Sequence, residues 1–125
     1  MKDLFIPETK NTPEVNLSVE NCIFTIKGPS FSDSVYDEIY TEVLEWIENE
    51  MPKIDCEIDC VFSINILNSM TYKNIMQMLI KFVEYHNAGK KISITWYYEG
   101  DDEDNEEIAE DLSQIFDIPF AIKAV

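Results

Sequence analysis

The sequence predicts a single mixed α/β domain, on the basis of three observations. A chain of 125 residues suits one domain, and a hydrophobic content of 46% is enough to build its core. Apolar residues alternate with a period of two in some segments and recur every three or four residues in others. The resulting order, β-β-α-β-α-β-α-β, predicts an N-terminal hairpin, three main helices and later strands made parallel by right-handed crossovers.

The first predicted elements are a hairpin and a helix. Two β-rich segments, 15–17 and 22–27, are typical of hairpin strands, and Gly28-Pro29 ends the second. From residue 34 to residue 50 the apolar residues form one helical stripe. Pro52 follows directly and ends this helix.

Strands and helices then alternate to the end of the chain. Each strand is predicted from period-two alternation, and each helix from apolar spacings of three and four. The predicted segments are a strand at 55–65, a helix after 67–70 that ends near Gly89, a strand at 91–98, a helix at 106–116 and a strand at 119–125.

The net charge of the chain disfavours two classes of binding partner, nucleic acids and membrane surfaces. Nine Lys and Arg stand against 25 Asp and Glu, a formal net charge of −16. Phosphate backbones and anionic lipid headgroups are bound largely through Lys and Arg, so we expect neither nucleic-acid nor membrane binding. No apolar stretch approaches the ~20 residues that span a bilayer, and the start of the chain lacks the apolar core of a secretion signal. We therefore expect a cytoplasmic protein.

The chain has three cysteines, an odd number. Cys56 and Cys60 fall within the predicted strand, about 13 Å apart along one face, so they can neither pair nor share a metal ion. We interpret Cys22, Cys56 and Cys60 as small buried apolar residues in a reducing compartment. The sequence gives no reason to expect redox chemistry.

No catalytic constellation is evident in the sequence. The single histidine, His86, falls late in the second predicted helix with no partner placed beside it. The acidic run 99–107 fails as a calcium loop, because Glu107 and Ser113 stand where glycine and a bidentate carboxylate are needed. It is better interpreted as the acidic start of the third helix, with a weak nonspecific cation site left open. We therefore expect a non-enzymatic protein without a cofactor.

The segment between the central predicted strand and the second predicted helix is a candidate functional site. Residues 67–73 join the central predicted strand to the second helix and place two hydroxyls, Ser69 and Thr71, where that helix begins. Sites in parallel α/β sheets lie at the carboxyl ends of strands. A phosphate there would meet free backbone N–H groups and would add about −1.5 to −2 charges. The alternative is that either hydroxyl only caps the helix, and the two roles are compatible.

Several segments together resemble a known family. These segments are Ile6-Pro7-Glu8-Thr9, Thr12-Pro13, Gly28-Pro29-Ser30-Phe31-Ser32-Asp33, Leu67-Asn68-Ser69-Met70-Thr71, Trp96-Tyr97-Tyr98 and Pro119-Phe120-Ala121-Ile122. With them, the chain is similar to the bacterial SpoIIAA-type anti-sigma-factor antagonists, whose fold is called STAS, and more closely to the SiaC family of regulatory phosphoproteins.

The resemblance implies a STAS-like fold and one regulatory domain over residues 1–125. It implies a non-enzymatic switch that is phosphorylated by a SiaB-like Ser/Thr kinase and reset by a SiaA-like metal-dependent phosphatase. The unphosphorylated form is then expected to bind and activate a diguanylate cyclase, the enzyme that makes cyclic di-GMP.

The resemblance also implies where the phosphate goes. The family pattern Asn-Thr-Ser-Ser maps onto residues 68–71, which places Ser69 at the phosphoacceptor threonine. Met70 replaces a serine of the pattern, so Thr71 stays as an alternate acceptor. The family's Ser-Tyr-Pro-Glu stretch corresponds here to residues 30–33, which lose the proline and keep an acid.

The expected partner surface surrounds this acceptor. It comprises Ser30, Asp33, Asn68, Ser69, Met70, Thr71, Tyr72 and Lys73. A second hypothesis is a constitutive acidic module that occupies a basic surface on its partner without any phosphorylation. It predicts an affinity that collapses with salt and that does not depend on Ser69 or Thr71.

Overall fold

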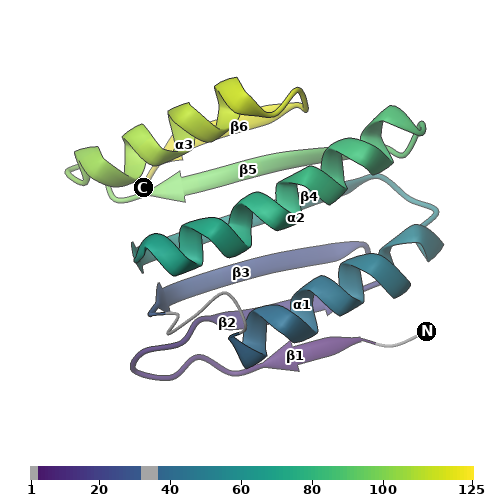
Figure 1. Ribbon diagram of the computed structural model, residues 1–125, viewed down its shortest axis with the longest axis horizontal. Helices are drawn as coiled ribbons and strands as arrows, with labels where there is room; N and C mark the ends of the chain where they lie inside the picture. The colour runs from purple at the N-terminus through teal and green to yellow at the C-terminus, as the bar shows by residue number, and fades with distance from the viewer. Residues whose placement is uncertain (1–2, 32–36) are drawn as a thin grey trace.

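The protein is a two-layer domain in which helices cover one face of a six-stranded sheet (Figure 1). The computed structural model describes residues 3–31 and 37–125. The strands lie in chain order, from β1 at one edge to β6 at the other. The elements are β1 (Leu4–Ile6), β2 (Glu14–Ser18), β3 (Ile23–Ser30), α1 (Glu38–Asn49), the 3-10 turn η1 (Met51–Lys53), β4 (Ile58–Leu67), α2 (Ser69–Asn87), β5 (Ile92–Tyr98), α3 (Glu103–Ile115) and β6 (Phe120–Ala124).

The sheet is mixed, as predicted. β1 pairs with β2 and β2 with β3 in antiparallel fashion, whereas β3 to β6 are parallel to one another. Because each parallel connection moves one strand further in the same direction, its right-handed crossover places α1, α2 and α3 on the same face. The predicted hairpin, parallel strands and three helices are confirmed, while β1 was not predicted because three residues are too short for a period-two signal.

Several element boundaries differ from the predicted ones. β4 starts at Ile58 instead of residue 55. α3 starts at Glu103 instead of residue 106, because the side chain of Asp102 accepts a hydrogen bond from the N–H of Asn105 at 3.1 Å and caps it. The predicted start of the first helix at residue 34 lies outside the described residues, and the helix is described from Glu38.

The core lies between the helices and the sheet and is centred on aromatic rings. Phe24 of β3 packs against Trp46 of α1, Phe62 of β4 and Phe82 of α2, with ring centroids 6.2, 5.9 and 5.2 Å apart. Phe62 in turn stacks on Trp96 of β5 at 5.5 Å. Contacts of this kind bury large apolar areas and fix the position of each helix over the strands.

A buried amide fixes α3 on the sheet. Asn105 accepts a hydrogen bond from Trp96 Nε1 at 2.7 Å, and its Nδ2 donates to the carbonyl oxygen of Ile64 at 2.7 Å. Both ends of the amide are therefore satisfied in the core. In the described part of the chain, no helix is long and apolar enough to cross a membrane.

The prediction for the cysteines is partly wrong. Cys60 is a buried free thiol, as expected. Cys56, however, lies exposed in the loop before β4 and forms a disulfide with Cys22. The prediction failed because it placed Cys56 inside the strand, where its side chain would have faced the core.

Candidate functional site

The candidate site lies where β4 ends and α2 begins, and its first feature is a side-chain cap. Asn68 Oδ1 accepts a hydrogen bond from the N–H of Thr71 at 2.9 Å, and its carbonyl oxygen accepts from the N–H of Tyr72 at 3.0 Å. The interpretation of Ser69 or Thr71 as the cap is therefore wrong, because Asn68 is the residue that caps the helix. The hydroxyl of Ser69 is therefore not needed to cap the start of the helix.

The two candidate acceptors have opposite surroundings. Ser69 is the first residue of α2, and its side chain is exposed. Thr71 is 0% exposed. Its Oγ1 donates to the carbonyl oxygen of Ser30 at 3.1 Å and lies 2.9 Å from Ser30 Oγ.

A third hydroxyl extends this buried cluster to α1. Tyr40 Oη lies 2.7 Å from Ser30 Oγ, and both side chains are buried. Each hydroxyl carries one proton, which fixes the direction of the chain. Since Thr71 donates to the backbone, Ser30 donates to Thr71 and Tyr40 donates to Ser30. The cluster therefore ties β3, α1 and the first turn of α2 together.

Burial extends the pH range over which the Tyr40 hydroxyl stays protonated. Removal from water is the main cause that raises the pKa of Tyr40 to about 12. The hydrogen bond to Ser30 lowers this pKa, and the negative charge of Asp37 raises it by a smaller amount. Tyr40 is a neutral donor at neutral pH, as the chain of hydroxyls requires, and the raised pKa keeps it neutral well into alkali.

The start of α2 differs electrostatically from the starts of the other helices. α1 carries Glu38 in its first turn, and α3 carries three acidic residues there, whereas α2 carries none. The acidic start predicted for the third helix is thus confirmed. Lys73 is exposed four residues after Ser69, on the same side of the helix. In this strongly acidic chain, the surface at Ser69 therefore combines an uncompensated helix dipole with a nearby cation.

An irregularity in the sheet shapes the edge beside Ser69. The pairing of β3 with β4 shifts between Gly28 and Pro29, so that Pro29 pairs with Ile66 and Ser30 with Leu67. The extra residue in β4 reverses the alternation of its side chains. Leu67 consequently packs against the core, whereas Ile66 is 46% exposed.

The exposed Ile66 has an apolar neighbour at the same edge. Phe31 directly follows β3, next to the strand that Ile66 belongs to, and is 45% exposed. Sequence reasoning did not single out either residue as a partner contact. The signal for Ile66 was hidden, because regular alternation along the strand would have placed it in the core.

The structure brings most of the predicted partner surface together. The pairing of β3 with β4 places Ser30 beside the segment 68–73. Asp33 lies outside the described residues. Among the others, Ser69 and Lys73 are exposed, Asn68, Met70 and Tyr72 are partly buried, and Ser30 and Thr71 are buried. The buried pair, Ser30 and Thr71, lies beneath the exposed residues of this surface.

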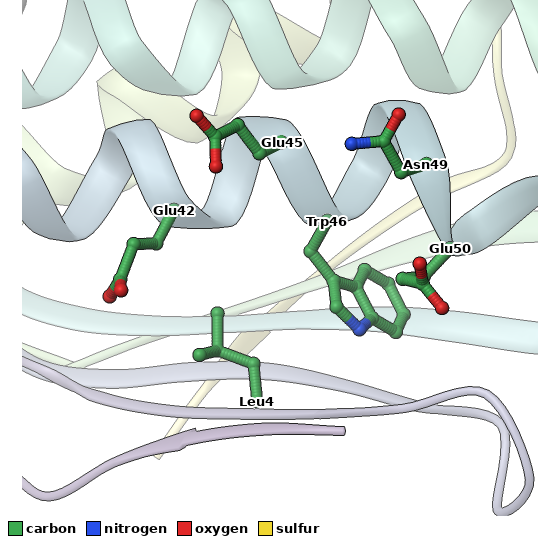
Figure 2. A pocket seen from close by; sticks show the side chains of 6 residues that line it. All are labelled: Leu4, Glu42, Glu45, Trp46, Asn49 and Glu50. Carbon is green, nitrogen blue, oxygen red and sulfur yellow. The ribbon is translucent and has the colours of Figure 1, made fainter. Parts of the chain in front are cut away.

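A groove between β1 and α1 is a second surface feature, and sequence reasoning missed it. Figure 2 shows Trp46 and Glu42 extending from α1 toward Leu4. The groove holds about 100 Å³, well below the roughly 300 Å³ at which pockets for small molecules begin. Its rim is acidic, with Glu42 and Glu45 exposed. Within residues 3–31 and 37–125, no three His, Cys, Asp or Glu side chains are placed to share a metal ion.

Comparisons with protein-family models and with known protein sequences find matches over nearly the whole chain. A protein-family model for SiaC family regulatory phosphoproteins matches residues 6–125. An uncharacterised protein of Pseudomonas aeruginosa strain UCBPP-PA14 is 28% identical over 124 residues, which is 99% of this chain and 98% of that protein.

Solved structures from Pseudomonas aeruginosa are similar over nearly the whole chain. The crystal structure of apo-SiaC has a TM-score of 0.88 at 28% identity and covers 99% of this chain and 100% of that one. A crystal structure of the diguanylate cyclase SiaD in complex with its activator SiaC contains a similar chain, with a TM-score of 0.90 at 28% identity. That match covers 98% of this chain and 100% of the other.

Proposed function

The chain belongs to the SiaC family of regulatory phosphoproteins, and from this membership we propose that it is a non-enzymatic switch whose phosphorylated residue is Ser69. The unphosphorylated form binds and activates a diguanylate cyclase, and the phosphate on Ser69 prevents that contact. The observation that carries the proposal is the exposure of Ser69 at the first residue of α2, beside a buried Thr71.

Access favours Ser69 over Thr71 as the acceptor. A kinase must bring the acceptor oxygen to the terminal phosphate of ATP, in line with the leaving group. The Thr71 oxygen is enclosed, and its proton is committed to the carbonyl oxygen of Ser30. Its phosphorylation would require the first turn of α2 to separate from β3, whereas Ser69 requires no such opening.

The position of Ser69 also explains how a phosphate can act without unfolding the domain. A phosphate at the first residue of a helix faces unpaired backbone N–H groups and the positive end of the dipole. Lys73 lies within reach on the next turn. The fold is therefore retained, while about −1.5 to −2 charges are added at the carboxyl end of the parallel strands, where Phe31 and Ile66 are also exposed. An apolar contact made there by a partner would be disrupted.

The proposed partners follow from family membership. The SiaC in the complex with SiaD is named as the activator of that cyclase, and its fold matches this chain closely. By the same resemblance, the phosphate is added by a SiaB-like Ser/Thr kinase and removed by a SiaA-like metal-dependent phosphatase. A switch that depends on ATP operates in the cytoplasm, which we propose as its location.

The test combines labelling and binding. The purified full chain is incubated with a SiaB-like kinase and ATP, and the modified residue is mapped by mass spectrometry. We expect one phosphate on Ser69 in the wild type, none on Ser69→Ala, and a phosphate still on Ser69 in Thr71→Val. Labelling of Thr71 in the wild-type chain, or of the Ser69→Ala protein at the wild-type rate, would overturn the assignment.

Binding to the cyclase is then measured by calorimetry. Ser69→Ala should bind like the wild type, and Ser69→Asp should bind at least tenfold more weakly. Gln77→Glu is the matched control, because it adds one negative charge to an exposed position two turns further along α2. Equal affinities of the Ser69→Ala and Ser69→Asp proteins would contradict the switch.

The constitutive acidic module is the second candidate, and the net charge of −16 favours it. The exposed Glu42 and Glu45 at the rim of the groove in Figure 2 would suit a basic partner. This function predicts strong weakening of binding by salt and equal binding of all Ser69 variants. The calorimetric comparison therefore separates the two candidates directly.

A further inference from the structure

Cys22 and Cys56 lie at the end of the domain opposite Ser69. Cys22 directly precedes β3, and Cys56 lies in the loop that leads into β4. These two strands are neighbours, with Ile23 paired to Asp59 at their amino ends, whereas Ser69 follows the carboxyl end of β4. The cysteines are 34 positions apart in the sequence, but their Cα atoms are 6.4 Å apart. This spacing lies within the range of natural disulfides, and the two sulfurs are joined.

The turn before β3 holds Cys22 in position. Its φ of 55° lies in the left-handed region, which few residues other than glycine adopt. The N–H of Cys22 donates to the carbonyl oxygen of Val19 at 3.3 Å, and the N–H of Asn21 donates to Ser18 Oγ at 3.2 Å. The left-handed conformation and these hydrogen bonds belong to the short hairpin loop between β2 and β3, and they hold the residue whose side chain reaches the neighbouring loop.

We propose that Cys22 and Cys56 form a reversible disulfide that makes the stability of this domain depend on the redox state of its surroundings. The cross-link closes a loop that contains β3, α1 and η1. Closing a loop of this length restricts the unfolded chain and raises the temperature of unfolding by about 10 °C. This inference does not rest on the proposed phosphorylation switch.

The oxidant in this proposal is a small-molecule disulfide such as oxidised glutathione. The exposed Cys56 thiolate attacks one of its sulfurs, breaks the S–S bond and releases one glutathione thiolate. The Cys22 thiolate then attacks the Cys56 sulfur of the mixed disulfide and releases the second glutathione thiolate. Two cysteine thiols are oxidised, one small-molecule disulfide is reduced to two thiols, and the cysteine protons end on the released glutathione.

Cys60 provides an internal control. It is fully buried, and burial raises its pKa well above the usual value, with the charge of Asp59 acting in the same direction. Cys60 therefore stays a protonated thiol and takes no part in exchange. An oxidised chain should contain one free thiol, and a reduced chain three.

The experiment uses the reduced full chain, equilibrated with mixtures of reduced and oxidised glutathione. Free thiols are alkylated after unfolding, counted by intact mass and mapped by peptide analysis. The expected result is a monomer with one alkylated thiol at Cys60, an unfolding temperature about 10 °C higher and full reversal by a dithiol. Three free thiols under oxidising conditions, a disulfide between two chains, or equal unfolding temperatures of the two forms would overturn the proposal.

Single variants test each step of the exchange. Cys22→Ser should retain a mixed disulfide on Cys56, because no second thiol is present to resolve it. Cys56→Ser should lose the redox-dependent shift in unfolding temperature, and Cys60→Ala should keep that shift. A shift retained in Cys56→Ser would contradict the assignment.

Discussion

Ser30 Oγ lies 2.9 Å from Thr71 Oγ1 and joins the carboxyl end of β3 to the first turn of α2. Since the Thr71 hydroxyl also donates to the Ser30 carbonyl oxygen, two hydrogen bonds connect these residues 41 positions apart. The exposed Ser69 is therefore presented by a helix end that is fixed from within. This arrangement separates the proposed phosphorylation site from the residues that hold the backbone.

Thr71→Val should destabilise the domain, whereas Ser69→Ala should not. Valine fills the space of threonine but leaves the buried Ser30 hydroxyl without its acceptor, which costs about 1–3 kcal/mol. Ser69→Ala changes an exposed side chain that makes no cap, so its effect should stay within about 0.5 kcal/mol. Equilibrium urea unfolding measures both. Equal effects of the two substitutions would show that the buried cluster does not support the site.

Tyr40 should make the domain sensitive to alkali. Its pKa is about 12 in the folded state and 10.0 without burial, so the folded state favours the neutral form. The stabilisation is complete below pH 10 and is lost as pH rises through about 12. The total loss is about 3 kcal/mol, at 1.36 kcal/mol per pKa unit.

The matched comparison for this effect is Tyr40→Phe. That protein should be less stable at neutral pH, because Ser30 loses a donor, but its stability should fall less steeply between pH 10 and pH 12. Cys60 also disfavours ionisation in the folded state, but it contributes equally to both proteins. Parallel stability curves for the two proteins would show that Tyr40 is not the titrating group.

Gly28→Ala should destabilise the carboxyl end of β3, which carries Ser30. Gly28 has a φ of 120°, and an added Cβ would lie 2.6 Å from Glu8 Oε1. The backbone conformation alone costs on the order of 1–3 kcal/mol for a residue with a side chain. Glu8 is exposed and can move, which adds a smaller cost.

Gly89→Ala is the control that separates the effect of the backbone conformation from the effect of the contact with Glu8. Gly89 also has a positive φ, of 101°, but a Cβ there would meet nothing within 4 Å. Unfolding by urea should therefore show a smaller loss for Gly89→Ala than for Gly28→Ala. The reverse order would mean that the close approach of Glu8 does not constrain the bulge.

Much of the fold was predictable because its elements carry strong periodicity. Alternation from Cys56 to Ile64 predicted the central strand, and the helical stripes predicted which faces cover the sheet. The predicted strand ended at residue 65, and alternation could not have indicated that a shift in pairing turns the next residue, Ile66, outward. A bulge is fixed by the pairing of two strands, and one strand's sequence does not contain that information.

The position of the candidate site could be predicted from the sequence, but the exposure and the hydrogen-bond partners of its side chains could not. Spacing alone did not distinguish the two hydroxyls at the start of the helix, and the family resemblance placed Ser69 first with Thr71 as the alternate. Packing against β3 is what leaves Ser69 exposed and Thr71 buried. The contribution of Tyr40 was hidden for the same reason, since it comes from α1, 31 positions before Thr71. Contacts between distant segments decide which polar residues are available to a partner.

Phosphorylation of Ser69 should stabilise the domain slightly instead of unfolding it. The first turn of α2 holds no acidic residue to repel the phosphate, and Lys73 lies one turn further on the same face. The dipole and the cation together should add about 0.5–1 kcal/mol to the free energy of unfolding at low salt. Thermal unfolding of the phosphorylated and unphosphorylated chains measures this difference.

Lys73→Met tests the contribution of the cation, since methionine keeps much of the length of the side chain without the charge. The gain on phosphorylation should fall by about 0.2–0.5 kcal/mol in this variant, and high salt should reduce the gain in both proteins. A loss of stability on phosphorylation would mean that the phosphate is repelled by the acidic surface as a whole. In that case the switch would act by loosening α2, in addition to changing the charge at the end of the strands where Phe31 and Ile66 are exposed.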